Sequence, residues 1–175
     1  INKNLYARDL EERIRFTYIC IYNCCIYMYV EERIKTEQPL PLQRRTIIHL
    51  MLINNLIGEQ MSQALKPFEV SLQQFNVLRI LRGQKGKPAN LSTLNDRMVS
   101  KMSNTTRLVD KLIAKGLANR NTCPENRRKV EIRLTEKGLV SLKAMDKAVD
   151  AAEKKLMGSL SEEELRQLNY LLDKV

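Results

Sequence analysis

The sequence is poor in the residues from which active sites and metal centres are most often built: its 175 residues include one histidine, no tryptophan and four cysteines. A zinc site needs about four closely spaced Cys or His ligands. Cys20, Cys24 and Cys25 have no second ligand pair near them, and His49 is far away in the sequence. The sequence therefore predicts no metal site and, because it also has no nucleophile motif, no enzymatic activity.

Glycine is scarce as well, with six residues in the chain. Gly83 and Gly86 share one loop, but this loop has no G-x-x-x-x-G-K-[ST] pattern and follows no predicted strand. A loop of this kind does not cradle phosphates, so we expect no nucleotide and no other cofactor.

No hydrophobic run is long enough for a transmembrane helix. The best candidate, Thr17 to Val30, has fourteen residues and contains Asn23, whereas a spanning helix needs roughly 20 residues. Asp9, Glu11 and Glu12 precede it at positions where a secretory signal would be basic. We therefore expect no membrane association and a cytoplasmic location.

The first 43 residues differ in composition from the rest of the chain. Five of the six tyrosines and three of the four cysteines lie within the first thirty positions. Two interpretations are open. The segment is either a strand or helix packed on the main body, or upstream sequence translated from a mis-set start, since the chain does not begin with Met. In both cases residues 1–43 are an atypical N-terminal extension of unknown role.

The net charge of +10 is concentrated in one region. Residues 79–137 contain fifteen Lys and Arg against five Asp and Glu, so the remainder of the chain is neutral. A run of cations is often only a solvated face. An excess that is confined to one module is instead typical of a surface that binds nucleic-acid phosphates.

A helix predicted from Ser103 to Gly116 lies in the middle of this basic region. Ser103 is a favourable N-cap, and Gly116 is favourable just beyond the helix C-terminus. On a helical wheel one side can be buried, and it carries Thr105, Leu108, Val109, Leu112 and Ile113. The other side is polar and carries Thr106, Arg107, Asp110 and Lys111. Hydroxyls and cations on an exposed helix face are suited to phosphates and base edges in a major groove.

A shorter helix is predicted just before this one. It covers Leu91–Val99, is capped by Ser92, and directs Leu91, Leu94 and Met98 inward. Only residues 100–102 separate the two helices, which is the spacing of a helix-turn-helix.

A basic hairpin is predicted after the two helices. Leu117–Asn121 and Lys129–Thr135 form its strands, and the tip between them carries Arg127 and Arg128. A basic hairpin in this position is the wing of a winged helix-turn-helix.

Long apolar helices flank the module. Arg44–Leu65 is predicted as one helix that is apolar on more than one side. A second long helix follows Gly138, and Ser161 with Glu164 opens a final capped helix. The apolar residues of the final helix, expected to point inward, are Leu165, Leu168, Leu171, Leu172 and Val175. A second subunit is the simplest partner that could bury so much apolar surface. Taken together, these elements predict a fold that is mostly α with a small β-hairpin wing.

From about Ile47 to Val175 the chain resembles the MarR family of bacterial winged-helix transcriptional regulators. The matching segments are Ser71–Leu78, which starts with a capping box, Ser103–Leu117 with its text TRLVDKLIAKGL, Asn126-Arg127-Arg128, and Leu134–Gly138. One departure is Asn126, where the family usually has Asp. An Asp there would hold Arg128 by a charge-assisted hydrogen bond, whereas Asn126 offers only a neutral one. The neighbouring Glu125 is the residue that could supply the negative charge instead.

The resemblance implies a domain plan and a function. Residues 44–66 and 139–175 would form N- and C-terminal dimerisation helices around a winged helix-turn-helix domain at 67–138. The chain would then be a homodimeric regulator, expected to be a repressor, that binds a pseudo-palindromic operator in double-stranded DNA. A small aromatic or anionic effector, bound between the dimer helices and the winged module, would release the DNA.

Nine residues are expected to contact DNA. Arg107 is the first candidate for base contact, with Asn104, Thr106 and Lys111 beside it. The residues expected at phosphates are Ser92, Lys101 and Ser103. Arg127 and Arg128 are expected at the flanking minor groove.

Two alternatives use the same fold differently. A redox-sensing repressor would be switched by cysteine oxidation, and Cys123 has the cations Arg120 and Arg127 near it in sequence that could lower its pKa. A winged helix used only for protein docking would expose an apolar face, and the concentration of cations argues against that interpretation.

Overall fold

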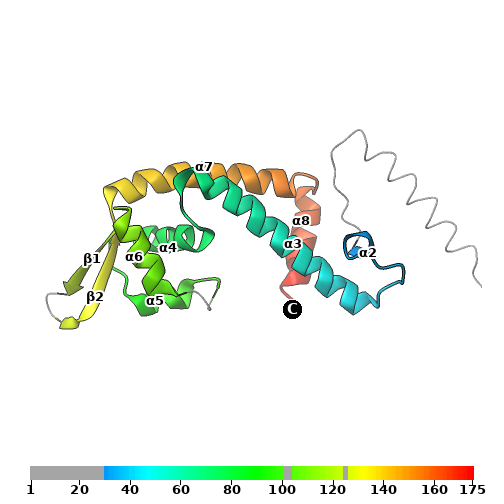
Figure 1. Cartoon of the computed structure of the whole chain (residues 1–175), viewed down its shortest axis with the longest axis horizontal. Helices are drawn as coiled ribbons and strands as arrows, with labels where there is room; N and C mark the ends of the chain where they lie inside the picture. The colour runs from blue at the N-terminus through cyan, green and yellow to red at the C-terminus, as the bar shows by residue number, and fades with distance from the viewer. Residues whose placement is uncertain (1–29, 101–103, 124–125) are drawn as a thin grey trace, which may run out of the picture. The chain divides into compact units, whose positions relative to one another are not determined.

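The structure is a computed structural model that describes residues 30–100, 104–123 and 126–175 (Figure 1). These residues form helices and one two-stranded antiparallel hairpin, which confirms the predicted fold class, mostly α with a small wing. The described residues divide into two compact units: those between 54 and 160, and those from 30 to 53 together with 161–175. Each unit is described by itself. No helix in the described ranges has both the length and the apolar character that crossing a membrane requires.

The central unit contains the basic module. After the end of α3 (Leu42–Leu65), its elements are η1 (Lys66–Phe68), α4 (Leu72–Gly83), α5 (Leu91–Arg97), α6 (Thr105–Ala114), β1 (Ala118–Cys123), β2 (Asn126–Leu134) and α7 (Glu136–Met157). Figure 1 shows α4, α5 and α6 grouped beside the hairpin. Their apolar faces share one core, in which the most fully buried large side chains include Phe75, Leu78, Leu94, Leu112, Ile132 and Leu142.

The capping box predicted at the start of α4 is present. The Ser71 hydroxyl accepts a hydrogen bond from the Gln74 backbone N–H at 3.2 Å, and Gln74 Oε1 accepts one from the Ser71 N–H at 2.9 Å. The two side chains thus satisfy backbone donors that the first turn of a helix leaves unpaired.

Two other caps differ from the prediction. α5 is capped by Asn90, whose side chain accepts from the Thr93 N–H, and not by Ser92. α6 is capped by Asn104 in place of Ser103, which lies outside the described residues. In both cases a good capping residue stands close to the predicted one, and the asparagine is the residue whose oxygen meets the N–H three positions on.

The wing is an antiparallel hairpin whose strand register shifts once, between Thr122 and Cys123. Ala118 pairs with Leu134 and Arg120 pairs with Ile132, and both strands extend further toward the tip than predicted. Ala89, just before α5, exchanges two backbone hydrogen bonds with Ile132, at 2.9 and 2.8 Å. The base of the wing is therefore fixed to the loop that leads into the helix-turn-helix.

α7 begins at Glu136, two residues before Gly138, with Thr135 as its N-cap. Gly138 is buried, and a Cβ atom there would overlap the carbonyl oxygen of Leu117. Only glycine therefore allows α7 to start this close to the end of the helix-turn-helix.

The terminal unit contains α2 (Val30–Arg33), the first part of α3 and α8 (Glu162–Leu172). α3 starts two residues earlier than predicted, and Arg45 on it pairs with Glu31 on α2 at 2.8 Å. The box of Ser161 and Glu164 that was predicted to cap α8 is present.

Apolar side chains remain exposed in this terminal unit. In the described ranges, ten of the twelve exposed large hydrophobic residues belong to it: Ile34, Leu42, Ile47, Leu50, Met51, Leu168, Tyr170, Leu171, Leu172 and Val175. The prediction that Leu168, Leu171, Leu172 and Val175 point inward is therefore not met within one chain, because a single copy leaves them exposed.

Candidate nucleic-acid interface

The second helix of the helix-turn-helix presents a polar face to solvent. On one side of α6, Thr105, Val109 and Leu112 are buried in the core. On the other side, Arg107 and Lys111 are exposed, as are Thr106 and Asp110. Among the residues that the structure describes, neither Arg107 nor Lys111 takes part in an ion pair. The amphipathic pattern predicted for this helix is confirmed, and both cations are accessible to a ligand.

Asn104 shapes the start of this face. Its side-chain oxygen accepts a hydrogen bond from the Arg107 N–H at 3.1 Å, and its side chain is exposed. The cap leaves the amide nitrogen of Asn104 able to donate, at the helix end where the macrodipole attracts an anion.

Four of the nine predicted DNA-binding residues come together at α6: Asn104, Thr106, Arg107 and Lys111. Ser92 is exposed in the first turn of α5. Lys101 and Ser103 lie outside the described residues. Arg127 and Arg128 were predicted in the tip of the wing, but they belong to β2, because this strand already begins at Asn126. Their side chains are outside the described part of the structure.

The N-terminal end of α6 is fixed to α5. Thr105 is 4% exposed, and its hydroxyl donates a hydrogen bond to the side-chain oxygen of Asn95. A buried hydroxyl with a partner on the neighbouring helix restrains the angle between the two helices.

The middle of α6 is connected to the wing. Arg120 on β1 pairs with Asp110 on α6 at 2.8 Å. Sequence reasoning missed this pair, because nothing in the local pattern indicates which of several acids faces Arg120.

The C-terminal end of α6 is held by side chains from two other segments. Lys115 pairs with Glu69 at 3.1 Å, and the ammonium group of Lys137 donates to the Lys115 carbonyl at 2.9 Å. The Thr135 hydroxyl donates to the carbonyl of Gly116, which has the positive φ of 70° expected at a helix end. The position of α6 is therefore tied directly to the start of α7.

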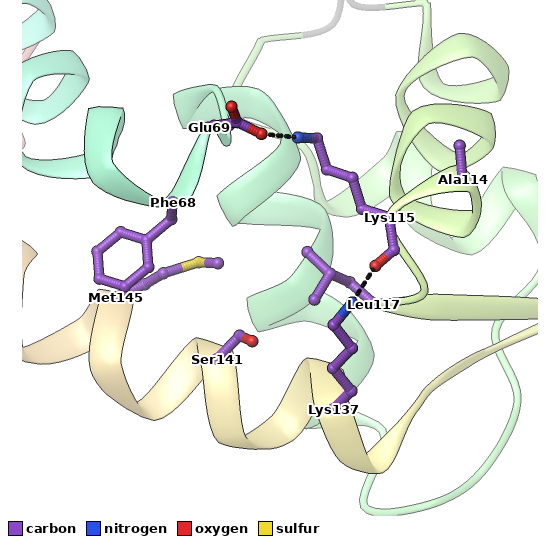
Figure 2. A pocket seen from close by; sticks show the side chains of 8 residues that line it. All are labelled: Phe68, Glu69, Ala114, Lys115, Leu117, Lys137, Ser141 and Met145. Atoms are coloured by element: carbon purple, nitrogen blue, oxygen red, sulfur yellow. Dashed lines mark hydrogen bonds and ion pairs between the residues drawn. The ribbon is translucent and has the colours of Figure 1, made fainter.

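A pocket of about 400 Å³ lies at this end of α6 (Figure 2). Its lining residues come from the segment after α3, the end of α6 and the start of α7: Phe68, Glu69, Ala114, Lys115, Leu117, Lys137, Ser141 and Met145. Figure 2 shows Lys115 reaching toward Glu69 and Lys137 reaching toward the Lys115 carbonyl. The cations of the pocket are thus the same side chains that hold the helix end. Across the described ranges no group of His, Cys, Asp and Glu could hold a metal ion.

The comparisons with known proteins all point to the same family. The MarR family profile matches residues 70–130. The HTH-type transcriptional repressor IacR of Pseudomonas putida is 26% identical over 126 residues, which cover 72% of this chain and 74% of that protein.

Solved structures agree with this assignment. A MarR transcription factor from Planctomyces limnophilus is 30% identical, with a TM-score of 0.61, covering 79% of this chain and 100% of that one. A cysteine-to-serine mutant of MarR from E. coli, complexed with operator DNA, is 25% identical, with a TM-score of 0.65, covering 76% and 93%. The chain therefore belongs to the MarR family of winged-helix transcription regulators, which are not enzymes.

Proposed function

We propose that the chain is a homodimeric, sequence-specific DNA-binding repressor of the cytoplasm. Two copies of α6 would enter successive major grooves on one side of a pseudo-palindromic operator, about 10 base pairs apart. The observation that carries the proposal is the exposed polar face of α6, on which Arg107 and Lys111 have no ion-pair partner among the described residues.

Two further facts support the DNA partner and the direction of control. The net positive charge of the chain comes from residues 79–137, which contain this helix and the wing, because the remaining residues carry equal numbers of positive and negative charges. One structural relative was solved with operator DNA, and IacR is a repressor.

Within the interface, each predicted residue has a proposed role. Arg107 would donate two hydrogen bonds to a base edge, assisted by Thr106, Lys111 and the amide nitrogen of Asn104. Phosphate contacts are proposed for Ser92, Lys101 and Ser103. Minor-groove contacts are proposed for Arg127 and Arg128.

The exposed apolar residues of the terminal unit support the proposed dimer. Helix faces that carry Ile47, Met51, Leu171 and similar residues, 51 to 62% exposed for these three, are costly to leave in water. A second copy of the chain would cover them and would fix the spacing of the two α6 helices.

Release of DNA by an effector is proposed to occur through the pocket beside α6. Phe68 and Met145 offer apolar surface to a ring, and Lys115 and Lys137 offer positive charge to an anion. An anion there would compete for the two lysines that hold the end of α6, and a small shift of α6 would spoil its match to the groove spacing.

Benzoate serves as a probe of this site. We expect millimolar benzoate to weaken operator binding, neutral benzyl alcohol to have little effect, and Lys137→Gln to reduce the response to benzoate. An unchanged response in the Lys137→Gln protein would place the effector elsewhere.

A salt series of fluorescence-anisotropy titrations tests the DNA contacts. The duplexes are an operator selected from a random pool and a random sequence of equal length. Arg107→Ala should cost about 1–3 kcal/mol on the operator and much less on random DNA. Lys101→Ala should weaken both duplexes alike and lower the slope of log Kd against log salt by roughly one. Equal losses on both duplexes for Arg107→Ala would reject its role in base recognition.

A further inference from the structure

One negative charge lies among the groups proposed to meet DNA. Asp110 is the only acidic residue of α6, and it is within one turn of both Arg107 and Lys111. Its side chain is 53% exposed. A free carboxylate at this position would repel the same phosphates that its neighbours attract.

Arg120 neutralises this carboxylate. Its Nη2 lies 2.8 Å from Oδ1 of Asp110, the length of a charge-assisted hydrogen bond. The Arg120 side chain is only 32% exposed, so water and salt screen the pair less than they screen a fully exposed one. In the described ranges Arg120 forms no ion pair other than the one with Asp110.

The hairpin determines where the Arg120 side chain starts. Arg120 is paired across the strands with Ile132, and cross-strand partners share one face of a hairpin. Ile132 is fully buried and is held by its two backbone hydrogen bonds to Ala89. The stem of Arg120 is therefore fixed on the face that packs against the helices, and its guanidinium bridges the root of the wing and the middle of α6.

We propose that Arg120 is a positioning residue for DNA binding that acts through Asp110. It would cancel the carboxylate on the recognition face and restrain the angle between the wing and α6, without itself contacting DNA. In the chain, α6 and β1 are joined only by the short turn at Gly116, so a side-chain bridge further along both elements limits their relative rotation. This inference rests on the proposed function, because it concerns how the same interface is held.

A double-mutant cycle on the selected operator tests the proposal. Arg120→Ala should weaken binding about tenfold, because it exposes an unpaired carboxylate and frees the wing. Asp110→Asn should bind at least as tightly as the unchanged protein. In the double variant, binding should return to within about threefold of the Asp110→Asn protein.

The salt dependence separates positioning from direct contact. For Arg120→Ala the slope of log Kd against log salt should stay unchanged, whereas loss of a phosphate contact would lower it by roughly 0.9. A lowered slope, or a double variant as weak as Arg120→Ala, would overturn the proposal. So would wild-type affinity in the Arg120→Ala protein.

Arg133→Ala is the matched control. Arg133 is on the same hairpin but pairs with Glu131 and with the Gly86 carbonyl, away from α6. Its loss should weaken binding by less than about threefold, and a loss equal to that of Arg120→Ala would contradict a specific role for Arg120.

A failure of the proposed DNA binding can be distinguished from the absence of a bridge between Arg120 and Asp110. If the unchanged protein bound no DNA, the same cycle in urea would still measure the bridge, because the midpoint shifts of Asp110→Asn and Arg120→Ala should then not add. Additive shifts would mean that no bridge exists.

Discussion

At the scale of single residues, Asn104 serves both the stability of α6 and the proposed interface. Its oxygen caps the helix through the Arg107 N–H. Asn104→Ala should therefore lower the free energy of unfolding by about 1 kcal/mol, measured by urea denaturation. Asn104→Ser should retain most of the stability, because serine also caps. Equal destabilisation by both substitutions would show that the cap is not what Asn104 contributes.

The serine control also isolates the proposed DNA contact. If the amide nitrogen of Asn104 contacts a base, Asn104→Ser should weaken operator binding while the unfolding midpoint stays near that of the unchanged protein. Operator affinity equal to that of the unchanged protein would remove Asn104 from the interface.

Residue-scale prediction from sequence succeeds where four neighbouring residues decide the outcome. The capping boxes at Ser71 and Ser161 each combine a serine with a Gln or Glu three residues later, and both are present. The predicted N-cap positions of α5 and α6 were wrong by two residues and by one residue, respectively. Near each helix start, two residues have comparable capping preference, and the backbone path through the turn, which sequence does not reveal, selects between them.

At the scale of elements, the junction between the hairpin and α7 depends on Gly138. A Cβ there would overlap a backbone oxygen, and the backbone cannot move aside as a flexible side chain can. Gly138→Ala should therefore lower the free energy of unfolding by more than about 2 kcal/mol. The matched variant is Gly83→Ala at the end of α4, where an added Cβ meets nothing within 4 Å. It should change stability by less than about 1 kcal/mol, and comparable losses in the two variants would refute the packing explanation.

α8 provides a pH-dependent prediction. Hydrogen bonds from the backbone and side chain of Ser161 lower the pKa of Glu164 from its usual 4.5. A depressed pKa in the folded state means that the cap stabilises α8 above pH 4.5 and is lost as the pH falls through the lower folded value. NMR chemical shifts should therefore report fraying of the first turn of α8 below pH 4.5. Glu164→Gln should show a smaller pH dependence, and identical titration of the two proteins would contradict this cause.

Elements were predicted better than their connections. The periodicity of apolar residues predicts α5, α6, the hairpin and the flanking helices, and the observed elements differ from the predicted ones only in where they begin and end. The ties of Lys115 to Glu69 and of Asp110 to Arg120 could not be predicted, because they join segments whose distance in space depends on the finished packing. The prediction that leucines of α8 point inward failed for a related reason, because one chain does not contain the surface proposed to cover them.

At the scale of the whole molecule, the proposed dimer depends on exposed apolar residues of the terminal unit. Light scattering after size exclusion should give a dimer at micromolar concentration. Leu171→Asp should shift it toward monomer and weaken operator binding, because two linked half-sites would no longer be engaged together. Val99→Asp alters a side chain that is 89% exposed, against 51% for Leu171, and it should leave the mass unchanged. A monomeric unchanged protein would contradict the dimer.

Hydroxyl-radical footprinting of the purified protein on its selected operator tests the central claim most directly. We expect two protected blocks, centred about 10 base pairs apart on one face of the duplex. Arg107→Ala should weaken the protection of both blocks together. A single protected block, or equal protection of a random duplex, would contradict an account in which two copies of α6 recognise DNA.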